Sequence, residues 1–131
     1  MLIIFKQILM MKLVLAGQNP YLKSIMNQYL AGIGYTVFCL DDASEGKLLV
    51  DRGEQIDLTL LLLDKEGFAK NFAQYLKEHY TANFGPIVGL KQESLAKREK
   101  EEAANFTDHL IDGFKTLSEL SSHLPKALRT A

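Results

Sequence analysis

A chain of 131 residues, 47% hydrophobic and 24% charged, has the size and composition of one soluble domain that buries its own core. Its 15 basic and 16 acidic residues give a formal net charge of -1, so no global field attracts nucleic acid or an anionic membrane. No apolar run reaches the roughly 20 residues that cross a bilayer. We therefore expect a protein that binds neither nucleic acid nor membrane.

The cysteine and histidine content bears on whether the chain forms a disulfide bond or a metal site. Cys39 is the only cysteine, so an internal disulfide is impossible and a reducing, cytoplasmic location is expected. It falls inside a predicted strand, where we expect an inert, small apolar residue. His79, His109 and His123 lack metal-ligand spacing, so no metal site is predicted.

The first eleven residues, MLIIFKQILMM, are mostly apolar but are interrupted by Lys6. They lack the long apolar stretch and the cleavage site of a signal peptide. We interpret residues 1–11 as an N-terminal extension or a start assigned too early, and residues 12–131 as the domain. An ordered extension would pack as an extra helix or strand.

The domain begins with a predicted strand and a capped helix. Residues 12–16 (KLVLA) form a short apolar run that ends in a Gly-Gln-Asn-Pro turn. Asn19 is a suitable helix cap and Pro20 suits a first helical turn. These signals predict a helix over residues 21–31, ended by a pair of glycines.

The next segment predicts a second strand, a helix and a third strand. Residues 36–40 (TVFCL) are β-branched and aromatic, which favours a strand. Asp41 and Asp42 are placed to cap a helix over residues 45–52. Residues 58–63 (LTLLLL) are apolar without alternation, which is typical of a central strand covered on both faces.

The second half of the chain continues the alternation. Helices are predicted over residues 68–80, 93–104 and 116–124, with strands over residues 86–90 and 109–111 between them. Pro125 is expected to end or kink the last helix. Five alternations of strand and helix predict one parallel sheet with helices on both faces, an α/β fold of the flavodoxin-like class.

In such a sheet, ligands bind outside the carboxyl ends of the strands. The residues at those ends are Gly17 and Gln18, Asp41 and Asp42, Asp64, Lys91 and Asp112. Asp64 stands alone, so its carboxylate either takes part in chemistry or caps a helix. Lys91 either binds an anion or is a solvated side chain. The serines, histidines and acids form no nucleophilic set, so an enzyme is not expected.

Several segments resemble the receiver domains of bacterial two-component response regulators, over about residues 12–124. LVLAGQNP resembles their first strand and loop, and GYTVFCLDDASEGKLLVDRGEQIDL resembles the stretch from their second strand to their third. GPIVGLK resembles the fourth strand, and AANFTDHLIDGF the fifth strand with its flanks. Asn105 stands where the family usually has a glycine, and Asn is the residue that next best tolerates the left-handed conformation.

The resemblance also implies where the family's active positions fall. The acidic pair after the first strand is matched by Gly17 and Gln18, which supply no carboxylate. The Thr or Ser after the fourth strand is matched by Lys91, and the Lys after the fifth strand by Asp112. In the family the acidic pair helps to hold Mg²⁺, and the other two positions bind phosphoryl oxygens.

The phosphoacceptor position is ambiguous. Counting from Asp57 places Leu62 there, whereas Asp64 matches only if the segment after the third strand is shortened. These departures predict a degenerate receiver, or pseudo-receiver, that is not an enzyme and needs no cofactor.

The favoured hypothesis is a signalling module that acts through protein–protein interaction, independently of Asp phosphorylation. The resemblance implies another signalling protein (a kinase, effector or regulator) or a homodimer, bound through residues 97–104, 109–111 and 116–124. One alternative is a phosphorylatable receiver that uses Asp64 and Mg²⁺, with Asp41 or Asp42 as an unusual metal ligand. Another is a flavodoxin-like domain that binds a small ligand above Gly17, Gln18 and Lys91.

Overall fold

The computed structural model describes residues 11–63, 67–79 and 82–129, with side chains described as far as Leu124. Five parallel strands form one sheet in the order β2-β1-β3-β4-β5. Their bounds are β1 (Lys12–Ala16), β2 (Thr36–Leu40), β3 (Leu58–Leu62), β4 (Ile87–Lys91) and β5 (His109–Asp112). The predicted five-stranded, flavodoxin-like α/β fold is confirmed.

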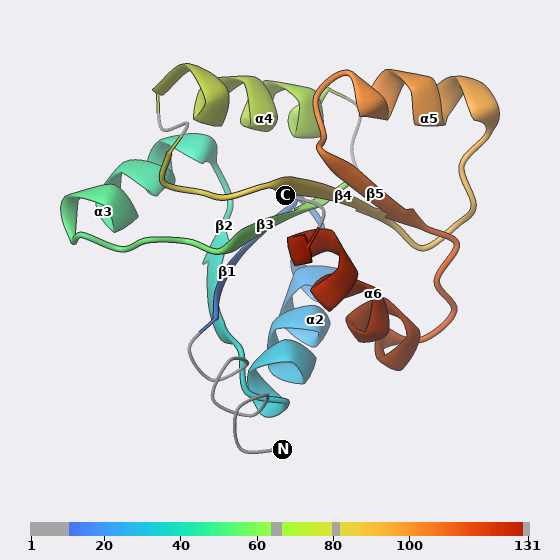
Figure 1. Cartoon of the computed structure of the whole chain (residues 1–131), viewed down its shortest axis with the longest axis horizontal. Coiled ribbons are helices and arrows are strands. Elements are labelled where there is room, and N and C mark those ends of the chain that lie inside the picture. The colour runs from blue at the N-terminus through green and yellow to red at the C-terminus, as the bar shows by residue number, and fades with distance from the viewer. Residues whose placement is uncertain (1–10, 64–66, 80–81, 130–131) are drawn as a thin grey trace.

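Helices cover both faces of this sheet (Figure 1). The helical elements are α2 (Pro20–Gly32), the short 3₁₀ helix η1 (Ala43–Glu45), α3 (Gly46–Asp51), α4 (Phe68–His79), α5 (Lys97–Ala104) and α6 (Leu117–Arg129). Helices α2 and α6 lie on one face, and α3, α4 and α5 lie on the other (Figure 1). Within the described residues, no helix has the length and apolar character of a membrane span.

The sheet separates two apolar cores. Alternate residues of β1 point to opposite faces, so Leu13 and Leu15 join the core under α2 and α6, and Val14 joins the other. Strand β3 is buried along its whole length, which confirms the central strand predicted from its unbroken apolar run. The carboxyl edge of the sheet is therefore built on a fully packed base.

Two helix boundaries differ from the sequence prediction by several residues. The helix expected from residue 93 begins at Lys97, because the Leu95 N–H donates instead to the Asp112 carboxylate at 2.7 Å. The prediction that Pro125 could end the last helix is wrong, since α6 continues to Arg129. A proline removes only one intrahelical hydrogen bond, and Leu124 just before it is fully buried.

Two residue environments also differ. Asn105 is right-handed, with φ -71°, because Ala103 O accepts bonds from both the N–H and the hydroxyl of Thr107. The helix end therefore needs no left-handed residue. Cys39 lies in β2 as predicted but is exposed rather than buried, since β2 is an edge strand.

Candidate functional site

The carboxyl ends of the strands meet along one edge, as the sequence predicted. Strand β1 pairs with β2 and β3, β3 pairs with β4, and β4 pairs with β5, all in parallel. Gly17 and Gln18 therefore lie beside Asp41, while Lys91 is the register partner of Asp112. The edge thus has a β1–β2 side and a β4–β5 side, with the end of β3 between them.

Gly17 and Leu62 are sterically matched. Leu62 is 2% exposed and belongs to the core under α2 and α6. A Cβ built on Gly17 would lie 2.6 Å from Leu62 Cδ1 and 2.8 Å from Leu62 Cβ, closer than real Cβ contacts come. Any larger residue at position 17 would force Leu62 to move. Asp64, the other candidate near this strand end, lies outside the described residues.

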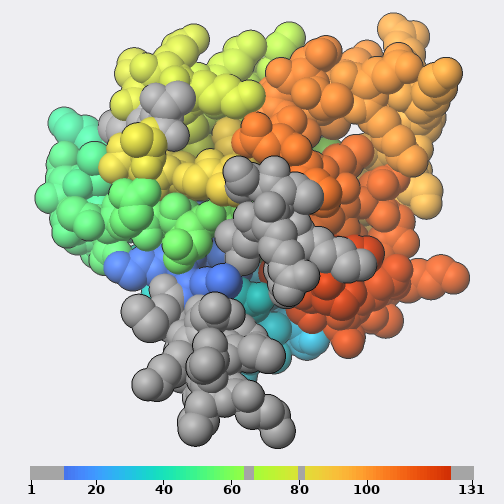
Figure 2. Space-filling model, viewed as in Figure 1, coloured from blue at the N-terminus to red at the C-terminus, as the bar shows by residue number. Residues whose placement is uncertain are grey.

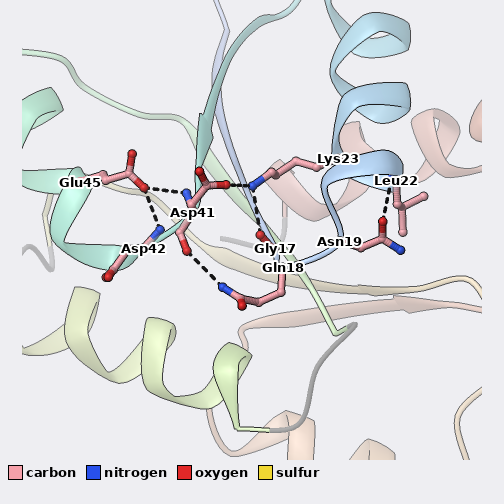
Figure 3. A network of polar contacts seen from close by, with 8 residues as sticks. All are labelled: Gly17, Gln18, Asn19, Leu22, Lys23, Asp41, Asp42 and Glu45. Carbon is pink, nitrogen blue, oxygen red and sulfur yellow. Dashed lines mark hydrogen bonds and ion pairs between the residues drawn. The ribbon is translucent and has the colours of Figure 1, made fainter.

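Lys23 is a residue of this edge that sequence reasoning did not single out. Its side chain reaches from α2 to the ends of β1 and β2, where Nζ donates to Gly17 O at 3.1 Å and forms an ion pair with Asp41 (Figure 3). Asn19 sets this helix in place, because its Oδ1 accepts from Leu22 N at 3.1 Å as the predicted N-cap. A charged residue among the apolar positions of the helix was the available signal.

The loop after β2 is fixed by its own acids. Asp42 Oδ1 accepts from Ser44 N at 3.0 Å. Glu45 Oε1 accepts from the N–H groups of Asp41 and Asp42 at 2.7 and 2.9 Å (Figure 3). This capping box confirms the capping role predicted for Asp42. Asp41 is not a cap, because its carboxylate pairs with Lys23.

On the β4–β5 side, Lys91 turns toward the protein. Its Nζ donates to Leu63 O at 3.0 Å and lies 3.5 Å from Glu93 Oε2. The side chain is half-buried, and the main chain at the end of β3 offers it an acceptor, so Lys91 is only partly solvated and a role as an anion ligand stays a prediction. This ammonium therefore fastens the end of β3 to the end of β4.

Asp112 holds the loop that follows β4. Its Oδ2 accepts from Leu95 N at 2.7 Å and lies 3.8 Å from Lys100 Nζ. Gly113, which follows it, has φ +70°, a conformation that favours glycine. A Cβ on Gly113 would lie 2.6 Å from Ser94 Oγ, so the same loop packs closely on the end of β5.

A groove of about 870 Å³ opens between α4 and α5, beside Lys91. Lysines line it from two elements, Lys70 and Lys77 on α4 and Lys91 on β4, and α5 contributes Glu99 and Glu102. Gly17 and Gln18 do not line it. The structure therefore does not join the two halves of the small-ligand site that the sequence suggested.

Comparison with known proteins identifies the architecture. No family model matches the sequence, and no curated protein is similar to it in sequence. The solved structure of the chemotaxis protein CheY4 of Vibrio cholerae superimposes with a TM-score of 0.71 at 17% identity, over 90% of this chain and 98% of that one. The fold is that of a receiver domain.

Two further structures agree. The BeF3-activated N-terminal receiver domain of Klebsiella pneumoniae RstA gives a TM-score of 0.69 at 18% identity, over 90% of this chain and 98% of that one. The receiver domain of the sensor histidine kinase PA1611 of Pseudomonas aeruginosa gives 0.70 at 15% identity, over 91% and 98%. That structure has a magnesium ion coordinated in its active site cleft. Identities this low establish the receiver fold and nothing finer.

The described residues at the β1–β2 side do not fit such a metal. Magnesium requires oxygen donors, usually carboxylates, yet Gly17 has no side chain and Gln18 supplies an amide instead of a carboxylate. The Gly17 carbonyl and the Asp41 carboxylate are both engaged by the Lys23 ammonium. No three His, Cys, Asp or Glu side chains gather as a metal site in the part of the chain that the structure describes.

Proposed function

We propose that this receiver fold is a signalling module that binds a protein partner and does not depend on Asp phosphorylation. The observation that carries the proposal is the contact between Gly17 and Leu62. The family resemblance places an acidic residue at the first position and, when the chain is counted from Asp57, the phosphoacceptor at the second. Here the apolar side chain of Leu62 occupies the space that a side chain at position 17 would need, and Leu62 itself is only 2% exposed.

The charges on the β4–β5 side support the same proposal. A phosphoryl group is anionic, and Asp112 would repel it where the family resemblance places a lysine. The Lys91 ammonium offers a positive charge, but it already donates to Leu63 O and pairs with Glu93. Binding a phosphoryl oxygen would require Lys91 to exchange those contacts.

The face proposed for the partner consists of α5, β5 and α6. Strand β5 is an edge strand of the sheet, and its two flanking helices lie on opposite faces. In the space-filling view this orange-to-red surface occupies the right-hand side of the molecule (Figure 2). The exposed Lys97, Arg98 and Glu101 give it mixed charge, which suits a partner of complementary pattern, either another signalling protein or a second copy.

Acetyl phosphate with Mg²⁺ tests the phosphorylation part of the proposal. The intact mass of the treated protein should remain that of the untreated protein, because a carboxylate pair for the metal is missing. A phosphoryl adduct that is lost in Asp64→Asn would overturn the proposal and establish the phosphorylatable alternative.

Charge reversal tests the partner face. Arg98→Glu should weaken binding to a partner isolated with the wild-type chain, or weaken the dimer in size-exclusion chromatography. The matched control is Lys47→Glu, an exposed lysine on α3 and on the other side of the sheet from α6. Equal losses in the two variants would contradict the assignment of this face.

Small-ligand binding is a second candidate, favoured by the groove beside Lys91. Its volume of about 870 Å³ falls within the range of ligand pockets. Native mass spectrometry of the purified protein should then show a bound small molecule, and Lys91→Met should remove it. A protein that carries no ligand in such spectra would leave the protein-binding proposal alone.

A further inference from the structure

We infer that the Lys23 ammonium is an internal cation that ties the loops after β1 and β2 together and excludes a divalent cation from them. This inference rests on the proposed function and deepens it, because it names what replaces the metal. The receiver domain of PA1611 has a magnesium ion coordinated in its active site cleft. At the corresponding edge of this sheet, two oxygen atoms face a lysine instead.

Burial shows that Lys23 is held inside the fold. The residue is 8% exposed, and a charged group removed from water is costly unless it is paired. Its Nζ has two oxygen acceptors as partners, the Gly17 carbonyl at 3.1 Å and the Asp41 carboxylate. Asp41 is 81% exposed, so the acid approaches from the surface while the lysine approaches from the core (Figure 3).

The contacts join two loops that are far apart in sequence. Gly17 follows β1 and Asp41 follows β2, and these strands are neighbours in the sheet. Gln18 adds a second connection, since its Nε2 donates to Asp41 O at 3.3 Å (Figure 3). A divalent cation that coordinated both loops would connect the same two strand ends.

Lysine and metal are mutually exclusive here for electrostatic reasons. An ammonium only donates hydrogen bonds, whereas a magnesium ion only accepts electron pairs from oxygen ligands. Both therefore compete for the Gly17 carbonyl and the Asp41 carboxylate. A divalent cation beside the buried ammonium would also be repelled by it, and the low-dielectric surroundings strengthen that repulsion.

Manganese is the probe for this inference, because it is a paramagnetic divalent cation that broadens nearby amide signals. Millimolar Mn²⁺ should leave the Gly17 and Asp41 amides of the wild type unbroadened. Lys23→Met retains an unbranched apolar stem and removes the charge, so both oxygens become available. Its Gly17 and Asp41 amides should broaden, with an Mn²⁺ affinity at least about ten-fold above that of the wild type, because the like-charge repulsion is gone.

The control is Lys47→Met, which removes the charge of an exposed lysine on α3. It should respond to Mn²⁺ as the wild type does. Broadening of Gly17 and Asp41 in the wild type, or equal Mn²⁺ responses in Lys23→Met and the wild type, would overturn the inference.

A second variant covers the case in which Lys23→Met does not fold. Asp41→Asn changes an exposed side chain and breaks the ion pair without removing the buried charge. Amide hydrogen exchange in the loop after β2 should accelerate in this variant, and unchanged exchange would count against the tie. Labelling of Asp64 by acetyl phosphate, by contrast, overturns the proposed function, so the two failures are distinguishable.

Discussion

On both sides of the carboxyl edge a charged side chain connects two loops, but the two side chains carry opposite charges. At β1 and β2, a buried lysine donates to the Gly17 main chain and pairs with an acid from the next loop. At β4 and β5, the Asp112 carboxylate accepts from a main-chain N–H of the loop before α5. In each case a charged side chain binds one loop to another rather than facing solvent.

The sides differ in how completely they are closed. Lys23 donates to the carbonyl of Gly17, which is packed against Leu62, and 10% of the lysine side chain is exposed. Asp112 is 17% exposed, and its register partner Lys91 borders the groove between α4 and α5. The comparison teaches that the β1–β2 side is tied together by a buried ammonium, whereas the β4 side borders a groove.

The largest expected effect on stability comes from placing an acid at position 62, beside Gly17. Leu62→Asp should lower the free energy of unfolding by about 4 kcal/mol, because it removes a buried apolar side chain and introduces an unpaired charge. Urea denaturation measures this. Leu48→Asp, at a leucine that is 64% exposed, should change stability by less than about 0.5 kcal/mol. A similar cost in both variants would show that Leu62 is not packed as described.

The contact of Gly17 with Leu62 predicts a coupled pair. Gly17→Ala should lower the free energy of unfolding by about 2 kcal/mol, since the new Cβ overlaps the leucine. In a Leu62→Ala background the overlap with Cδ1 is gone and only that with Cβ at 2.8 Å remains, so the same change should cost less than in the wild type, and a double-mutant cycle in urea measures the difference. Additive costs would contradict the steric match.

A substitution on the β4–β5 side should have a smaller effect on stability. Asp112→Ala leaves the Leu95 N–H without its acceptor, and we expect a loss of about 1–2 kcal/mol in the free energy of unfolding. Glu101→Ala, at an exposed position of α5, serves as the control and should be nearly neutral. A neutral Asp112→Ala would show that this carboxylate does not hold the loop.

The smallest expected effect is a change in the pKa and the reactivity of the Cys39 thiol. Burial raises the pKa of its thiol, the Lys23 ammonium lowers it and the Asp41 carboxylate raises it. Lys23→Met should therefore raise that pKa further and slow alkylation by iodoacetamide at pH 8 by about two-fold, because less thiolate is present. Asp41→Asn should have the opposite effect. Faster alkylation in Lys23→Met would contradict the placement of this charge.

Local signals in the sequence were sufficient for most of the fold. Unbroken apolar runs marked the strands, and the Asn19 cap and the Asp42 cap were both read correctly. The boundary of α5 was missed because a side chain distant in sequence, Asp112, holds the preceding loop out of the helix. The exposure of Cys39 was missed because it depends on strand order, which places β2 at an edge.

The site was predicted as a set of positions but not as a set of contacts. Strand ends placed Gly17, Lys91 and Asp112 at one edge, and the sheet confirms this. The match of Gly17 with Leu62 depends on how two neighbouring strands pack, which periodicity does not encode. The apolar neighbours of Lys23 on its helix were a signal, but only the folded helix shows which groups its ammonium reaches.

The most direct test of the central claim is the amide NMR spectrum with Mg²⁺ and beryllofluoride. Beryllofluoride mimics an acyl phosphate and requires both the metal and an acceptor carboxylate. If the charges at this edge are engaged within the protein, the amides of Gly17, Lys91 and Gly113 will not shift. Shifts clustered at these three residues, abolished in Asp64→Asn, would contradict the account and restore a phosphorylation switch.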